Sequence, residues 1–188
     1  MKVTILGSGP SSGIPTIHDG WGDCDPENPR NIRLRPSILV ENADTVVLMD
    51  TSPDLRQQML NSGVRRLDAV LYTHSHADHL HGIDDLRGIN KAMNAELPVY
   101  GDAETLAVIQ QRFEYTLTPL APGVDFYYKP VLNLHEIAPG DHFSIGDLDI
   151  QTFDQDHGFS RTLGYRFGPL AFTTDLKDLP EQYFAALE

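Results

Sequence analysis

The residues best suited to chemistry lie in one short segment, Thr73–His79. It holds three imidazoles, from His74, His76 and His79, and the carboxylate of Asp78. Neutral imidazoles and carboxylates bind zinc, manganese, iron or nickel. In an extended segment, residues two apart point to the same side, so His74 and His76 can hold one ion together. A turn after His76 can direct Asp78 and His79 toward a second ion. The alternative is a polar surface loop that happens to be rich in histidine.

Apolar patterns predict the strands and helices that position this segment. An apolar strand over residues 67–72 leads directly into it. One helix is expected to begin with Ser52 as its N-cap and Pro53 at its first position, and to end near Gly63. Further helices are expected over residues 102–113 and from residue 180 onward. The other strands are expected at residues 2–6, 37–41, 45–49, 98–100, 131–137, 143–145, 148–153, 163–167 and 170–173. Strands outnumber helices, and hairpin turns outnumber βαβ crossovers, which predicts an α+β fold.

The pattern His-x-His-x-Asp-His at residues 74–79 resembles the signature of the metallo-β-lactamase fold hydrolases. Asp50, His157 and Asp175 resemble that family's other motifs in order and spacing, although each alone would be an ordinary strand-end or loop residue. The resemblance implies an αββα sandwich with two divalent ions at one edge of its sheets. It implies that Asp50 lies behind the ligands and steadies them. The metal ligands that it implies are His74, His76 and His157 for one ion, and Asp78 and His79 for the other, with Asp175 bridging the two.

A narrower resemblance, to the PhnP-type phosphodiesterases and their RNase Z-like relatives, extends over most of the chain. It is carried by residues 7–15, 31–37, 54–58 and 79–87. Those enzymes open cyclic ribose phosphates. The PhnP-type pattern includes a Cys-x-Cys-x-x-Cys cluster for a structural zinc, whereas this chain has only Cys24 in that region. One thiolate does not complete a four-ligand zinc site, so no structural zinc is expected.

The chain departs from the family pattern after Asp175. The family's fifth motif is a further histidine on a later strand, and PhnP-type enzymes use a downstream histidine to protonate the leaving group. The residues that follow Asp175 include no histidine. We therefore expect an under-liganded second metal site. We also expect a single domain, residues 1–188, whose sandwich is incomplete at its C-terminus and whose open edges favour self-association.

Composition and charge limit the classes of partner that the chain is expected to bind. The chain has 188 residues and a net charge of −13, which argues against nucleic acid and anionic membranes as partners. It has one cysteine, no leader pattern and no apolar run that approaches the ~18 residues of a membrane span, so we expect a cytoplasmic protein. Arg30, Arg33 and Arg35 form the one local basic cluster. Arg33 and Arg35 are candidates to clamp a substrate phosphate, although surface ion pairing is the favoured interpretation.

Together these features predict a metal-dependent hydrolase. The favoured activity is that of a phosphodiesterase acting on a small, cyclic phosphodiester, with zinc or manganese as the favoured ions. In this hypothesis a metal-bridging hydroxide attacks phosphorus, and Asp78 orients it. Two alternatives stay open. One is a non-catalytic metal-binding fragment that acts through assembly, and the other is a thioester or lactone hydrolase that uses the same ligands.

Overall fold

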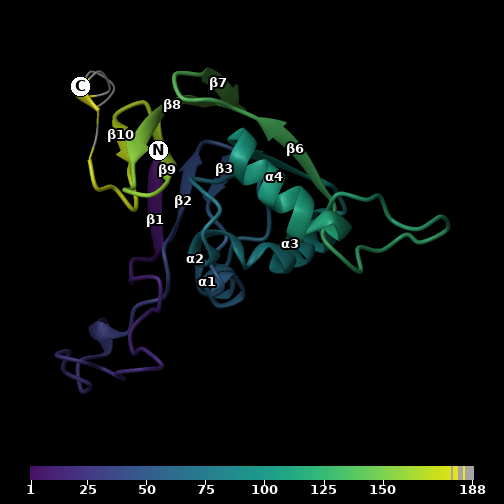
Figure 1. The fold of residues 1–188 in the computed structure, drawn as a ribbon. Coiled ribbons are helices and arrows are strands. Elements are labelled where there is room, and N and C mark those ends of the chain that lie inside the picture. Colours follow the sequence, from purple (N-terminus) through teal and green to yellow (C-terminus); the bar gives the residue numbers. More distant parts are fainter. Residues whose placement is uncertain (179, 182–183, 185–188) are drawn as a thin grey trace.

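Two β-sheets and a layer of helices make up the fold (Figure 1). The computed structural model describes residues 1–178, 180, 181 and 184. The first sheet has the order β1-β2-β3-β4-β5-β6 and the second has the order β10-β9-β8-β7. In the first sheet, β1, β2 and β3 pair antiparallel, and β3 through β6 pair parallel. The second sheet is antiparallel throughout.

The bounds of these elements follow the chain. The strands of the first sheet are β1 (Lys2–Gly7), β2 (Ser37–Asn42), β3 (Thr45–Met49), β4 (Ala69–Leu71), β5 (Leu97–Gly101) and β6 (Leu132–Glu136). Those of the second are β7 (His142–Ile145), β8 (Leu148–Asp156), β9 (Arg161–Phe167) and β10 (Leu170–Phe172). The helices are α1 (Leu55–Ser62), α2 (Ala77–Leu80), α3 (Leu86–Met93) and α4 (Ala103–Arg112), with 3₁₀ turns η1 (Pro29–Asn31), η2 (Ile83–Asp85) and η3 (Glu114–Thr116).

The central strands β2, β3 and β4 of the first sheet are buried on both faces because they alternate two sets of apolar side chains. On β2 and β3, Leu39 and Leu48 face the helices and belong to a core with Leu55, Ile89 and Leu106. Their neighbours along the strands face the second sheet. The core between the two sheets contains Ile38, Val40, Val47, Met49, Ala69, Leu71, Ile150, Leu163, Tyr165 and Phe167. The predicted α+β class is confirmed, and the strands lie within a few residues of their expected bounds.

Two expectations about helices need correction. The first helix begins at Leu55, two residues later than expected, and Ser52 is not its cap. The buried Ser52 hydroxyl accepts from the Asp54 amide and donates to Gln58 Oε1, so it stabilises the turn before the helix. The second correction concerns α2 and α3, which the sequence analysis did not predict as helices. The helix expected from residue 180 lies mostly outside the described residues.

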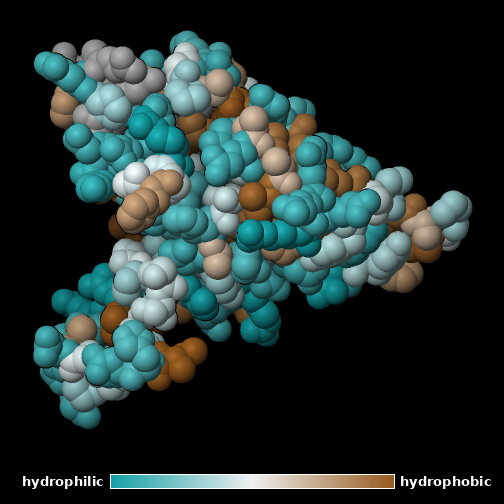
Figure 2. Space-filling view, viewed as in Figure 1, coloured by the Kyte–Doolittle hydropathy of each residue, from teal (hydrophilic) through white to brown (hydrophobic). Residues whose placement is uncertain are grey.

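Two long connections project from the layered body. One comprises residues 8–33 between β1 and β2, and the other is the green loop between α4 and β6 in Figure 1. Both carry exposed apolar side chains, Ile17 and Ile32 on the first and Phe126 on the second. Apolar colour is visible on both projections in Figure 2. Among the described residues, no helix is long and apolar enough to cross a membrane.

A bidentate ion pair ties the start of α1 to the strand-leading segment before β2. Arg35 donates to the Asp54 carboxylate from Nε at 2.9 Å and Nη2 at 2.7 Å, and its backbone amide donates at 2.9 Å. These hydrogen bonds outweigh desolvation and lower the pKa of Asp54. A carboxyl whose folded pKa is lowered stabilises the fold above its unfolded pKa of about 3.9, and this contribution is lost as pH falls through the folded value.

We therefore expect Asp54→Asn to lower the free energy of unfolding by about 1–2 kcal/mol at pH 7. The difference from the parent chain should shrink as pH falls below about 4, since the parent carboxyl is then protonated as well. Urea unfolding between pH 7 and pH 3 measures both effects. Asp125→Asn, at an exposed loop position, is the matched control. A difference that stays constant with pH would contradict this account.

Candidate metal centre

The ends of two neighbouring parallel strands place most of the predicted ligands. Asp50 follows β3, and the segment from Thr73 to His76 follows β4, so both leave the same edge of the sheet. The short helix α2 begins at once and carries Asp78 and His79. The second sheet supplies His157 after β8 and Asp175 after β10. Residues separated by about a hundred positions thus meet at one edge of the two sheets.

The buried carboxylate of Asp50 organises this edge. Its Oδ1 accepts from the Thr73 amide at 2.8 Å, and its Oδ2 accepts from the Thr73 hydroxyl at 2.8 Å. Oδ2 also lies 2.7 Å from Nδ1 of His79, and neither side chain is exposed. Asp50 adopts a left-handed backbone conformation, with φ of 58°. A non-glycine residue in that region is strained, which is typical of functional sites whose surroundings hold the residue in place.

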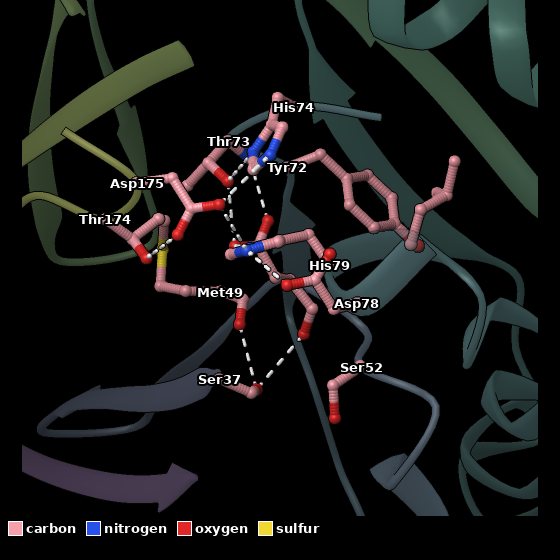
Figure 3. A network of polar contacts seen from close by, with 12 residues as sticks. Ser37, Met49, Ser52, Tyr72, Thr73, His74, Asp78, His79, Thr174 and Asp175 are labelled. Atoms are coloured by element: carbon pink, nitrogen blue, oxygen red, sulfur yellow. Dashed lines mark hydrogen bonds and ion pairs between the residues drawn. The ribbon is translucent and has the colours of Figure 1, made fainter. Parts of the chain in front are cut away.

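These hydrogen bonds set which ring nitrogens face the centre. Because the Thr73 hydroxyl donates to Asp50, it is free to accept from Nδ1 of His74, 3.0 Å away. Because His79 Nδ1 faces the Asp50 carboxylate, it is the donor there. Both rings therefore direct Nε2 into the centre, as Figure 3 shows for His74 and His79. A carboxylate behind a histidine is the usual device that fixes the ring and raises its basicity as a ligand.

The candidate ligand atoms form two groups that share one residue. His74, His76, His157 and Asp175 offer ligand atoms that all lie within 4.8 Å of one another, and the same holds for Asp78, His79 and Asp175. Oδ2 of Asp175 lies 3.6, 3.4 and 3.5 Å from Nε2 of His74, His79 and His157. Two ligands on a tetrahedral ion with bonds of about 2.0–2.1 Å lie about 3.3–3.5 Å apart. The spacing therefore matches ligands that share an ion.

Two buried nitrogens test whether a metal fits. Nε2 of His74 and Nε2 of His79 have no hydrogen-bond partner among the described residues, although no solvent reaches either atom. Buried polar groups are nearly always paired, so two such atoms that point at one carboxylate oxygen call for a ligand. Imidazole and carboxylate are the donors that zinc and manganese accept. The donor set fits divalent cations.

The charges of the neighbouring groups also favour a bound cation. Burial lowers the pKa of His74 to about 4, so its ring is neutral at pH 7, which is the form that binds metal. Burial also opposes charge on His79, but the Asp50 carboxylate, its hydrogen bond with Nδ1 and the nearby Asp175 carboxylate outweigh burial and raise the pKa to about 12. The His79 imidazolium in turn lowers the pKa of Asp175 to about 2. Such a concentration of carboxylates favours a cation, and a metal ion at Nε2 of His79 would displace that proton.

Several positioning contacts were not anticipated from the sequence. The hydroxyl of Tyr165 in β9 donates to the Tyr72 carbonyl at 2.6 Å, and the Leu163 amide donates to the Thr73 carbonyl at 2.8 Å. These bonds join the second sheet to the ligand segment. On the other side, the Thr51 hydroxyl lies 2.8 Å from the Tyr72 hydroxyl and donates to the Leu80 carbonyl. The one sequence signal for Thr73 was its place directly before the first histidine.

Gly82 allows the turn after α2 to pack tightly against the end of β3. A Cβ at this position would lie 2.0 Å from the Ser52 carbonyl oxygen, and the Gly82 amide donates to the Thr51 carbonyl. No side chain fits in this space, so a glycine is required. The contact holds the C-terminal end of α2, and with it His79, against the Asp50 strand end.

The arginine candidates are placed differently from the metal ligands. The Arg35 side chain forms the ion pair with Asp54, which uses the paired donors that a phosphate clamp would need. Arg33 donates from Nη1 to the Ser8 hydroxyl. The geometry thus favours the ion-pair interpretation for Arg35. Cys24 is half-buried in the projecting loop and belongs to neither ligand group found among the described residues.

Comparison with known proteins identifies the family. Residues 45–188 match the family model described as "Beta-lactamase superfamily domain". The chain therefore belongs to the beta-lactamase superfamily, and its architecture is the metallo-β-lactamase fold.

Within that superfamily, the chain is similar to a crystal structure described as a new diphosphatase from the PhnP family. The two are 32% identical with a TM-score of 0.86, over 98% of this chain and 68% of that one. Zinc-bound PqqB from Methylobacterium extorquens shares the fold at 22% identity, with a TM-score of 0.74, over 99% of this chain and 69% of that one. The predicted resemblance to the PhnP branch is thus confirmed at the level of similarity.

Curated relatives carry two different names. An octanoyltransferase of Porphyromonas gingivalis is 38% identical over 190 residues, and a ribonuclease Z of Methanopyrus kandleri is 30% identical over 143 residues. The matches cover 100% and 73% of this chain. The chain spans 37% of the length of the octanoyltransferase and 45% of that of the ribonuclease.

The role of Thr73 predicts the effect of a nearly isosteric change. Thr73→Val removes the hydroxyl that links Asp50 to His74 and leaves the backbone hydrogen bond intact, so folding should be retained. We expect the affinity for zinc to fall by about 10–100-fold, the usual cost of losing a hydrogen-bond partner behind a metal ligand. Competition with a chromophoric chelator measures it, and Thr118→Val on an exposed loop is the control. Affinities within about twofold of each other would contradict the role.

Proposed function

We propose that this chain carries the two-metal centre of a hydrolase that cleaves phosphodiesters. The observation that carries the proposal is the position of Asp175 Oδ2. It lies 3.4 to 3.6 Å from the Nε2 atoms of His74 and His157 in one ligand group and of His79 in the other. One carboxylate oxygen shared between two ligand sets is the arrangement that bridges a pair of cations. Paired ions, about 3.5–4 Å apart, clamp the attacking and leaving oxygens of an in-line displacement at phosphorus.

In this proposal each residue has a definite task. His74, His76 and His157 hold one ion, Asp78 and His79 hold the other, and Asp175 bridges them. Asp50 and Thr73 keep the rings in the orientation that exposes Nε2. Bound divalent ions, with zinc or manganese favoured, would acidify water and neutralise charge on the phosphoryl oxygens. Asp78 is buried, and desolvation raises its pKa, but His79 lowers the pKa by more, so Asp78 stays ionised at neutral pH and can accept a hydrogen bond from the attacking water.

The names of the similar proteins support chemistry at phosphorus. The diphosphatase at 32% identity and the ribonuclease Z at 30% both act on bonds between phosphorus and oxygen. The octanoyltransferase matches the whole of this chain at 38% identity but only 37% of its own length, so its name does not say what the matched part does. The ligand set alone also suits thioester or lactone hydrolysis. A protein that binds metal without catalysis would have the same arrangement of ligand residues. These are the outcomes that the experiment must separate.

The charge near the centre favours a small substrate. Residues 130–160 contain six acidic side chains and neither lysine nor arginine, and this segment includes His157. Of these, Asp154 and Asp156 lie at the end of β8 that leads to His157, and negative charge there repels a long polyanion more than a single phosphodiester. We therefore retain a small or cyclic phosphodiester as the substrate class.

Metal content and turnover test the proposal together. The chain, loaded with Zn²⁺ or Mn²⁺, is assayed with bis-(p-nitrophenyl) phosphate, a p-nitrophenyl thioester and a lactone. We expect turnover of the phosphodiester, and a decrease of at least about 100-fold in His76→Ala, because this variant loses a direct ligand. His18→Ala, on the exposed projection, should behave as the parent. Turnover of the thioester or lactone alone would replace the proposed activity, and bound metal without any turnover would favour a non-catalytic role.

The bridging role of Asp175 gives a separate expectation. Asp175→Asn removes a charge shared by both groups, so both ions should bind more weakly. His157→Ala removes a ligand of one group only, so one ion should be retained with near-parental affinity. Metal content after dialysis against graded metal concentrations distinguishes the two patterns. Equal loss of both ions in His157→Ala would contradict the division of ligands.

A further inference from the structure

A groove on the helix layer combines positive charge with an apolar floor. It has a volume of about 700 Å³ and lies between α1 with its following turn and α3. It shares no residue with the metal centre. Its volume falls within the range of about 300–1,000 Å³ that is typical of small-molecule sites.

Four cations line this groove: Arg56, Arg65, Arg87 and Lys91. The lining contains one acidic residue, Asp85. The side chains of Arg56, Arg65 and Lys91 form no hydrogen bond or ion pair with any residue that the structure describes. In a chain of net charge −13, four of the 14 basic residues gather in this one groove. An anion is the complementary partner for such a site.

Two features of α3 suggest that the groove is kept for a ligand. Arg87 and Lys91 are four residues apart on this helix, so they lie on one face and repel each other, which destabilises a helix. Gly88 lies between them and lines the same groove. A Cβ there would meet nothing within 4 Å, so packing does not require a glycine, and a helix favours alanine. Both choices reduce the stability of the helix, and both favour the close approach of an anion.

The floor of the groove is apolar. Met59, Val64 and Ile89 line it, together with Leu60, whose side chain is 61% exposed. A free inorganic anion would gain nothing from these side chains, whereas an apolar chain would bury them. The long side chains of arginine and lysine can cover such a chain with their methylene groups while their charged ends bind its head group.

We propose that this groove is a binding site for a small amphiphilic anion, an apolar chain that ends in a carboxylate or a phosphate. The head group lies among Arg56, Arg65, Arg87 and Lys91, and the chain lies over Met59, Leu60 and Ile89. The site is independent of the metal centre and of the proposed hydrolysis.

Calorimetric titration of the metal-free chain tests this proposal, since bound metal would itself attract the head group. The probes are decanoate and decyl phosphate below their micellar concentrations, octyl glucoside for a chain without charge, and inorganic phosphate for charge without a chain. We expect saturable binding of decanoate, decyl phosphate or both, which also identifies the head group, and at least about tenfold weaker binding of the other two probes.

Two kinds of variant locate the binding. The double variant Arg65→Glu, Lys91→Glu reverses two of the four positive charges. Gly88→Leu fills the groove with a side chain that favours a helix. Each should raise the Kd by at least about tenfold, whereas the exposed controls Arg112→Glu and Ala107→Leu on α4 should change it by less than about twofold. Circular dichroism confirms that the variants are folded.

Three outcomes would overturn the proposal. The first is decanoate and decyl phosphate binding that neither groove variant changes. The second is binding of octyl glucoside or inorganic phosphate as tight as that of the amphiphilic anions. Octyl glucoside would then indicate a merely apolar patch, and phosphate a merely charged one. The third is binding of a ten-nucleotide single strand, lost in the charge variant, without binding of either amphiphile, since the groove would then be a polyanion surface.

Discussion

The buried carboxylate of Asp50 is the interaction on which the rest of the site depends. It accepts hydrogen bonds from the Thr73 amide, the Thr73 hydroxyl and the His79 ring. These bonds join the end of β3 to the ligand segment after β4 and to α2. An unpaired carboxylate at such depth would be strongly unfavourable, so these three donors hold the strand ends in one arrangement. The ring nitrogens that face the candidate ions follow from that arrangement.

The centre also depends on the contact between the two sheets. The first sheet supplies the ligand segment, and the second supplies His157 and Asp175. The packed apolar layer between the sheets sets their separation, and the bonds from Tyr165 and Leu163 connect β9 to the strand that carries the histidines. Small displacements at this seam would change the Asp175 distances directly, which is why a densely packed core is suited to hold such a site.

Four of the 14 basic residues of this acidic chain gather at one place on the helix layer. The segment that leads to His157 is acidic and free of lysine and arginine, while the α1–α3 groove gathers four cations over apolar side chains. The two surfaces therefore attract ligands of different kinds. In the functions proposed above, this separation lets the chain bind a phosphodiester at the metal centre and an amphiphilic anion at a distinct site.

The sequence by itself determined the class of fold and the candidate ligands at residues 74–79, because strand alternation and the spacing of these residues are local patterns that survive without a structure. His157 and Asp175 became candidates only through the family resemblance. The sequence also predicted that α1 ends near Gly63 and that α4 begins near Asp102. It could not show that Asp54 would pair with Arg35 and move the start of α1, or that α3 would form around Gly88, because these outcomes depend on partners distant in the chain. Only the tertiary structure gave the distances from Asp175 to both groups of candidate ligands, and showed that Thr73 orients the His74 ring and Asp50 the His79 ring. Such distances arise from the packing of two sheets, and no spacing along a single chain encodes them.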